Sequence, residues 1–277
     1  MAYNKLITIL HVTDIHDSFD NIKALELQLN TDGIAVDIIL VSGDISTMPM
    51  GINPNDLDLI ATFEKSVIKV LTELFKICPK VVYIPGNHDP INFFNKFEYP
   101  LINDNIINLH KDMFRIADGL VVVGFGGSLP GYKSGVMEWD GFPHHQTDTY
   151  EAELEPFLAR ILSNNPEITE YIAEDDVIIL MTHVGPDGFP TAIDYTEPNT
   201  PITCGSTSLR KCLLSNAQNK VILNIHGHTH VGIGHNLIGK ITVSNPGPLK
   251  SGKYGLYTFS RLEKLWKITS IHLNAIK

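Results

Sequence analysis

The feature that most constrains the fold is a repeated pairing of a short apolar run with a turn that carries metal-binding side chains. Five such turns occur along the chain, each after a run rich in Val, Ile and Leu. The turns are Asp14-Ile15-His16, Gly43-Asp44, Gly86-Asn87-His88-Asp89, His183 and Gly227-His228-Thr229-His230. Continuous apolar runs of this length are typical of strands buried on both faces. The sequence therefore predicts a buried sheet with functional side chains at the ends of its strands.

Strand-length apolar runs alternate with amphipathic stretches in the first part of the chain. The strands are expected at Lys5–Val12, Val36–Ser42, Lys80–Ile84, Leu120–Gly124, Asp176–Thr182, Lys220–Ile225, Lys240–Ser244, Tyr254–Phe259 and Leu265–His272. The helices are expected at Phe19–Asn30, Asn55–Lys76, Asp148–Ser163 and Ser206–Asn216. Strand–helix alternation followed by a strand-rich end predicts a layered α/β sheet whose later part turns antiparallel.

The domain organisation follows from length and from the lack of a linker. At 277 residues, 43% of them apolar, the chain can form one large α/β domain over 1–277. Two long stretches, 126–147 and 184–205, are rich in Gly, Pro and aromatic residues, and we expect them to form walls of a substrate site. Whether their aromatic residues line a pocket or only pack the loops is open. These residues are Tyr132, Trp139, Phe142, Phe189 and Tyr195.

Composition excludes several classes of protein. A net charge of −10, with no run of five or more Lys and Arg, opposes sequence-independent binding of nucleic acid. Three cysteines without a CxxC spacing do not predict a disulfide scaffold or a thiolate zinc site. The apolar run near the start is too short to span a membrane and lacks a signal-peptide cleavage site. We therefore expect a cytoplasmic protein that does not bind membranes.

The turns that carry ligands are expected to meet in one site. Asp14, Asp44, Asn87, His183 and His228 each lie within four residues of the end of a predicted strand. In an α/β sheet the loops at the carboxyl ends of the strands gather at one edge. Oxygen and imidazole donors without a thiolate favour Mn, Fe or Zn. Because the donors exceed what one ion needs, the set indicates a two-metal centre for hydrolysis at phosphorus.

The five blocks resemble those of the calcineurin-like metallophosphoesterase superfamily, which run D-x-H, G-D, G-N-H-(D/E), H and G-H-x-H. This sequence matches each block in order, over roughly residues 5–250. Gly124-Phe125-Gly126-Gly127-Ser128 and Asn245-Pro246-Gly247-Pro248 also look like segments of the small prokaryote-type, single-domain members. The resemblance implies a four-layer α/β/β/α sandwich, with two mixed sheets face to face and helices outside.

The resemblance also implies a role for each motif residue. One metal ion would be held by Asp14, His16, Asp44 and His230. The other would be held by Asp44, Asn87, His183 and His228, with Asp44 bridging. A hydroxide shared between the ions would attack in line the phosphorus of a small phosphomonoester or phosphodiester. His88 would act at the leaving-group oxygen as general acid or charge stabiliser, oriented by Asp89.

Other polar residues near the motifs have simpler interpretations. His11 and His226 lie at the ends of buried-looking strands, so we expect hydrogen-bonded core histidines. Asp17 is expected to be a carboxylate at a helix N-terminus, rather than a support for the neighbouring metal ligand. His144 and His145 could contact substrate or lie in a solvated loop, and the sequence leaves this open.

Two other functions within the superfamily compete with a small-molecule phosphoesterase. A nuclease, like the superfamily's DNA-repair enzyme, needs basic surface, which the charge of −10 opposes. A binding or scaffold protein, like its retromer subunit, would be expected to have lost ligands, above all the histidine of G-N-H. His88 and every ligand are intact. We therefore expect a metal-dependent phosphatase or phosphodiesterase acting on a small phosphate ester.

Overall fold

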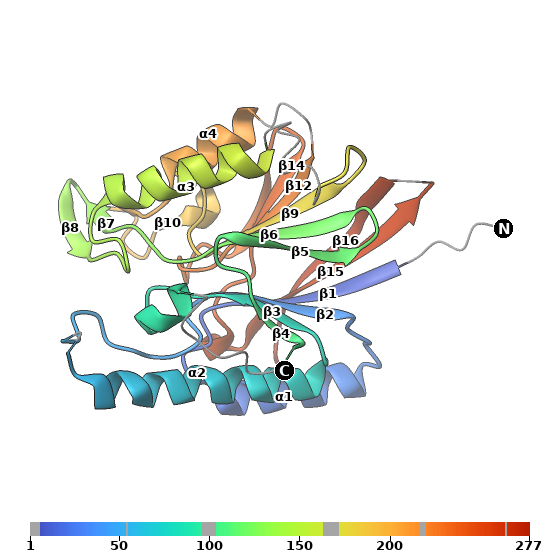
Figure 1. The fold of residues 1–277 in the computed structure, drawn as a ribbon, viewed down its shortest axis with the longest axis horizontal. Helices are drawn as coiled ribbons and strands as arrows, with labels where there is room; N and C mark the ends of the chain where they lie inside the picture. Colours follow the sequence, from blue (N-terminus) through green and yellow to red (C-terminus); the bar gives the residue numbers. More distant parts are fainter. Residues whose placement is uncertain (1–5, 54, 96–103, 163–171, 216–219, 264) are drawn as a thin grey trace.

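Four layers make up the molecule in a computed structural model, which describes residues 6–53, 55–95, 104–162, 172–215, 220–263 and 265–277. Figure 1 shows one helix pair at the bottom, two large sheets stacked above it, and a second helix pair at the top. Each large sheet contains both parallel and antiparallel pairs. The predicted α/β sandwich of two mixed sheets flanked by helices is therefore confirmed.

The first large sheet is built around the N-terminal strand. Its order is β16 (Leu265–Ala275), β15 (Lys253–Leu262), β1 (Leu6–Val12), β2 (Ile38–Ser42), β3 (Val81–Ile84) and β4 (Ile106–Asn108). Strands β1 to β4 run parallel, while β15 and β16 pair antiparallel as the strand-rich end predicted. The helices α1 (Phe19–Thr31) and α2 (Leu57–Ile77) cover its outer face.

The second large sheet repeats this plan. Its order is β13 (Gly234–Ile238), β14 (Ile241–Asn245), β12 (Val221–Ile225), β9 (Val177–Thr182), β6 (Leu120–Phe125) and β5 (Asp112–Ala117). The four inner strands are parallel, and the two edge strands are antiparallel. The helices α3 (Thr147–Leu162) and α4 (Thr207–Ser215) cover the outer face.

A third, small sheet forms where loops were expected. The stretches 126–147 and 184–205 contribute β7 (Gly131–Lys133), β8 (Val136–Trp139), β10 (Ile193–Asp194) and β11 (Ile202–Thr203). The order β10-β11-β7-β8 joins the two stretches into one unit, with Ile202 opposite Lys133. These strands are too short to show an alternating pattern. The two stretches are thus tied together by long-range pairing, although each was expected to be a loop.

The predicted elements are otherwise present. Each of the nine apolar runs contains a strand, and each of the four amphipathic stretches contains a helix. Strands β4, β5 and β13 were not predicted: β4 is only three residues long, and β5 and β13 are mostly half-buried or exposed. The predicted ends at Lys5, Ser163 and Asn216 lie outside the described residues. Short 3₁₀ turns occupy Ile91–Phe94, Pro190–Ala192 and Leu249–Ser251.

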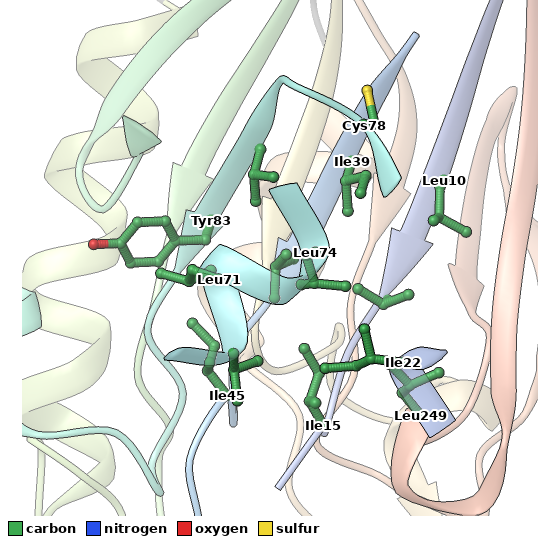
Figure 2. Packing of buried hydrophobic residues seen from close by; sticks show 14 of the residues in the cluster. Leu10, Ile15, Ile22, Ile39, Ile45, Leu71, Leu74, Cys78, Tyr83 and Leu249 are labelled. Carbon is green, nitrogen blue, oxygen red and sulfur yellow. The ribbon is translucent and has the colours of Figure 1, made fainter. Parts of the chain in front are cut away.

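The apolar side chains of helix α2 pack against the first sheet and stabilise it. Its apolar stripe buries Val67, Leu71 and Leu74 against the strands, and Figure 2 shows Leu71 near Tyr83 of β3 and Leu74 near Ile39 of β2. The helix begins at Asp56, whose side chain accepts a hydrogen bond from the backbone of Leu59 at 3.1 Å. This buried layer holds the ends of β1, β2 and β3, where the site lies. No described helix is both long and apolar enough to cross a membrane.

An ion pair at the start of β9 gives a test of the fold. The carboxylate of Asp176 is buried and accepts two hydrogen bonds of 2.8 Å from Arg115 and one of 2.7 Å from Ala173. Burial alone would raise the pKa of Asp176, but Arg115 and the amide lower it. Asp176→Asn should therefore lower the free energy of unfolding by about 1.5–3 kcal/mol, measured by urea denaturation of the metal-free protein. The effect should fade as the pH falls below the carboxylate's pKa.

The matched control is Asp118→Asn. Asp118 also pairs with an arginine, Arg261 at 2.7 Å, but its side chain is 83% exposed. This variant should lose only about 0–1 kcal/mol. Equal losses in the two variants would contradict the account.

Candidate metal centre

All five motif turns meet at one edge of the sandwich. Asp14, Asp44 and Asn87 follow β1, β2 and β3, which are parallel neighbours in the first sheet. His183 and His228 follow β9 and β12, which are parallel neighbours in the second. Because both sheets present carboxyl ends to the same place, residues more than two hundred positions apart become neighbours. The predicted convergence is confirmed.

The convergent side chains form two groups that could each hold a metal ion. The first group is Asp14, His16, Asp44 and His230, and the second is Asp44, His183 and His228. Within each group the candidate ligand atoms all lie within 4.8 Å of one another. Asn87 extends the second group, because its Oδ1 lies 3.0 Å from Nε2 of His183. Asp44 belongs to both groups, as expected for a bridging carboxylate.

The backbone is forced into an uncommon conformation at four of these residues. Asp14, His16, Asp44 and His228 have φ angles of 49°, 47°, 52° and 64°. This left-handed region costs a residue with a side chain about 1 kcal/mol or more. Hydrogen bonds between the first two turns stabilise this conformation. The amides of Ile15 and His16 both donate to the carbonyl of Asp44, at 2.8 and 3.1 Å. The rest of the fold maintains this strain at the ligands.

Two glycines allow the turns to pack closely. A Cβ added at Gly86 would lie 2.2 Å from both the amide nitrogen and Oδ1 of Asp44. A Cβ added at Gly227 would lie 1.9 Å from Oγ1 of Thr13 and 2.4 Å from Oδ2 of Asp14. Any larger residue at these positions would push an aspartate out of place. The glycines expected beside the ligands therefore have a steric function.

Backbone amides hold the two aspartates. The carboxylate of Asp14 accepts from the amide of His228 at 3.1–3.2 Å, and Oδ1 of Asp44 accepts from the amide of His88 at 2.8 Å. Both carboxylates are almost fully buried, with exposures of 1% and 2%. Burial alone would raise their pKa values, but His230 and His183 outweigh it and lower the pKa of each. Both are ionised at neutral pH, which is the form that binds a cation.

The imidazole groups divide into charged and neutral ones. Burial would lower the pKa of His183, but the charge and hydrogen bond of Asp44 raise it to about 9. The positive charge of protonated His183 therefore compensates the negative charges of Asp14 and Asp44 when no cation is bound. Burial, together with charged His183, lowers the pKa of His228 to about 3. His228 is therefore neutral and offers a lone pair to a metal ion.

Two buried nitrogen atoms support this assignment. Nε2 of His16 and Nε2 of His228 are buried and have no hydrogen-bond partner among the described residues. An unpaired buried polar atom is costly, so it calls for a partner of another kind. Each belongs to one of the two groups, beside ionised carboxylates. The residues present thus fit two cations bound through oxygen and imidazole ligands.

His88 lies beside the first group but is oriented differently from the prediction. Its ring centroid is 5.1 Å from that of His16, and its Nδ1 donates to the carbonyl of Met48 at 2.8 Å. Asp89, which was predicted to hold His88, instead accepts from the amides of Ile45, Ser46 and Gly86 at 2.7–3.2 Å. Burial and the charge of Asp44 raise the pKa of Asp89 to about 6. Asp89 therefore joins two ligand turns and does not orient the imidazole.

Asp17 also differs from its prediction. Its carboxylate accepts from the amide of Thr47 at 2.9 Å and from the hydroxyl of Ser66 at 2.5 Å. Helix α1 begins at Ser18 without a side-chain hydrogen bond to its first turn. From the sequence, the N-terminus of the adjacent helix α1 was the simplest partner for the carboxylate of Asp17. In the fold, Thr47 of the turn after β2 and Ser66 of helix α2 are its hydrogen-bond partners instead. Asp17 thus positions the turn after Asp44.

The remaining histidines are placed as follows. His11 and His226 are fully buried and hydrogen-bonded to Ser42 at 2.7 Å and to Thr191 at 2.8 Å, which confirms the expected core histidines. His144 is buried against Tyr150 of α3, whereas His145 is exposed and lies 2.6 Å from Asp140. Of the aromatic loop residues, Trp139 lies edge-on to His228, with ring centroids 5.9 Å apart.

Two contacts at the site had no sequence signal that pointed to them. The carbonyl of Met48 orients His88, but any residue supplies a carbonyl. Lys250 donates its amide to the carbonyl of Asp14 at 3.2 Å, and its charge contributes to a lowered pKa of His16, which is due first to burial. The segment 245–248 that precedes Lys250 was noted in the sequence only because it looks like a segment of the family.

Comparison with known proteins supports what the fold and site define. The family profile described as calcineurin-like phosphoesterase matches residues 7–232. The chain therefore belongs to the calcineurin-like phosphoesterase family, as the five sequence blocks predicted. No curated protein matches it significantly.

Solved structures show the same fold at low sequence identity. The protein TT1561 of Thermus thermophilus is 16% identical with a TM-score of 0.60, covering 99% of this chain and 100% of its own. A dimetal phosphatase from Danio rerio is 13% identical with a TM-score of 0.55, covering 98% and 99%. YfkN from Bacillus subtilis, a calcineurin-like phosphoesterase, is 13% identical with a TM-score of 0.50, covering 99% and 91%. These likenesses concern the fold.

Replacing the shared carboxylate tests the centre. Asp44→Asn removes the charge common to both groups, so metal content should fall from about two ions per chain to below about one. Metal analysis after dialysis against Mn would measure this. Asp118→Asn is the matched control, because Asp118 is an exposed carboxylate outside both groups and pairs with Arg261, so metal content should stay unchanged. Full metal content in the Asp44 variant would contradict the assignment.

The raised pKa of His183 predicts how stability depends on pH. With a folded pKa of about 9 against a usual 6.5, the proton on His183 stabilises the metal-free protein fully below pH 6.5. This contribution is lost as the pH rises through about 9. The melting temperature of the metal-free protein should therefore fall between about pH 7 and about pH 9. A metal ion would replace the proton, so the loaded protein should show a smaller fall, and equal falls would contradict this.

Proposed function

We propose that this protein is a binuclear metal-dependent phosphoesterase that hydrolyses a small phosphomonoester or phosphodiester. The observation that carries the proposal is Asp44, a buried ionised carboxylate common to two complete groups of metal-binding side chains. A single structural ion would need only one of these groups. Membership in the family supports hydrolysis of phosphate esters as the reaction class.

The chain's own residues divide into two ligand sets. The first ion would be held by Asp14, His16, Asp44 and His230, and the second by Asp44, Asn87, His183 and His228. When bound, Mn, Fe or Zn ions supply Lewis acidity toward phosphate oxygens and activate water. The side chain of His230 is 37% exposed, whereas His183 is fully buried, so substrate would approach from the side of the first group.

His88 is proposed to act at the leaving-group oxygen. The carbonyl oxygen of Met48 can only accept, so Nδ1 of His88 must carry the proton in that hydrogen bond. This leaves Nε2 as the atom that can hold a second proton and donate it to the departing oxygen. Because its amide donates to Asp44, His88 is also fixed relative to both groups. Proton donation of this kind contributes about 10²–10⁴-fold to rate.

The substrate is proposed to be a small ester rather than nucleic acid. The net charge of −10 opposes binding of a phosphate-rich polymer. We further propose that 126–147 and 184–205, joined through the small sheet, form one wall of the site. Trp139 beside His228 supports this arrangement. The whole 1–277 chain would then serve one active site in the cytoplasm.

The test is metal-dependent hydrolysis of nitrophenyl phosphate and bis(nitrophenyl) phosphate by protein loaded with Mn, Fe or Zn. His88→Ala should keep its metal content while kcat falls about 10²–10⁴-fold, because only the proton donor is removed. His235→Ala, at an exposed position on β13, is the control and should leave kcat unchanged. No turnover with any of these metals would overturn the proposal in favour of a binding protein. Full activity of the His88 variant would overturn the role of that residue.

A further inference from the structure

An apolar pocket of about 280 Å³ lies next to the candidate metal centre. Four parts of the chain form it: the turn after β2, helix α2, the 3₁₀ turn after β3, and the loop after β8. The lining residues are Met48, Pro49, Met50, Gly51, Ile52, Ile60, Ile91, Phe142, Pro143 and His145. None of the metal-ligand residues is among them, so the pocket is distinct from the two ligand groups.

Two methionines connect the pocket to the centre. Met48 lines the pocket, and its carbonyl accepts the hydrogen bond that orients His88. Met50 also lines the pocket, and its sulfur lies 3.9 Å from Nδ2 of Asn87. A group in the pocket would therefore contact Met48, whose carbonyl holds the imidazole proposed to protonate the leaving oxygen.

The chemistry of the lining excludes a charged occupant. No Lys, Arg, Asp or Glu is among the lining residues, so the pocket offers no partner for a second phosphate or a carboxylate. Its single titratable side chain, His145, lies 2.6 Å from Asp140. The methionines adapt to irregular shapes, and the ring of Phe142 offers an aromatic surface. The pocket thus fits an uncharged apolar group.

We propose that this pocket binds the leaving group of the substrate, and that the substrate is a phosphoester of an apolar, uncharged alcohol. The inference rests on the proposed function, because it needs the phosphorus at the metal centre and the leaving oxygen at His88. Phosphate bound by the two ligand groups would direct the ester's alcohol part past His88 into the pocket. Burial of that part stabilises the bound ester and selects it over polar esters.

The first test compares two esters whose alcohols have similar acidity. Benzyl phosphate carries an apolar ring, whereas methyl phosphate has no group to fill the pocket. Burying the ring should raise kcat/KM for benzyl phosphate about 30-fold over methyl phosphate. Equal values for the two esters, with the enzyme active on both, would overturn the pocket inference and leave the proposed function intact.

Variants at the rim of the pocket locate the effect. Ile91 is 43% exposed, so a polar residue is tolerated there. Ile91→Gln and Ile91→Glu should lower the preference for benzyl over methyl phosphate about tenfold, and the glutamine variant separates polarity from charge. The control is Leu214→Glu on α4, where Leu214 is 64% exposed, and its preference should equal that of the unmodified protein. An unchanged preference in both Ile91 variants would overturn the inference.

A binding measurement separates this inference from the proposed function. 1-Naphthol, an apolar alcohol, is titrated with metal-free protein and its fluorescence recorded. Binding that is weakened about tenfold by Ile91→Glu, but not by Leu214→Glu, supports the pocket even if no ester is hydrolysed. Absence of binding, or equal binding by all three proteins, would overturn it.

Discussion

The carboxylate of Asp44 is the group on which the rest of this structure depends. It is buried, ionised and close to imidazoles from both sheets, with His183 at 3.4 Å and His16 at 3.8 Å. A buried charge of this kind is unfavourable unless it is paired. The amide of His88 and the proton on His183 compensate it in the metal-free chain. Two cations held by the two ligand groups that share this residue would compensate it more fully.

Strain and steric constraint are concentrated around the same residue. Asp14, His16 and Asp44 all have left-handed backbone angles, and Gly86 leaves no room for a side chain beside Asp44. Such conformations persist only when the surrounding packing requires them. The layers of buried strand and helix residues, including Leu71 and Leu74 of α2, supply that packing. The large apolar interior therefore serves to hold a few polar turns in costly conformations.

Much of this arrangement could be predicted because its signals are local. Continuous apolar runs predicted the inner strands, and the position of each ligand after such a run placed Asp14, Asp44 and His183 at one edge. The small third sheet could not be predicted, since its strands of two to four residues depend on pairing between distant segments.

The partners of charged side chains were also hidden from the sequence. Asp89 follows His88 directly, yet its carboxylate accepts from amides of the turn after β2, while the imidazole of His88 donates to the carbonyl of Met48. Asp17 likewise contacts helix α2 rather than the helix that it precedes. The apolar pocket lined by Met48 is formed by four separate segments and has no sequence motif. Ligand identity is thus local information, whereas orientation and specificity arise from tertiary contacts.

The most direct test of the shared-carboxylate account is a crystal structure of the Mn-loaded protein with anomalous scattering recorded at the metal edge. The account predicts two peaks, one bordered by Asp14, His16 and His230 and the other by Asn87, His183 and His228, with Asp44 contacting both. A single peak, or two peaks that do not share Asp44, would contradict it.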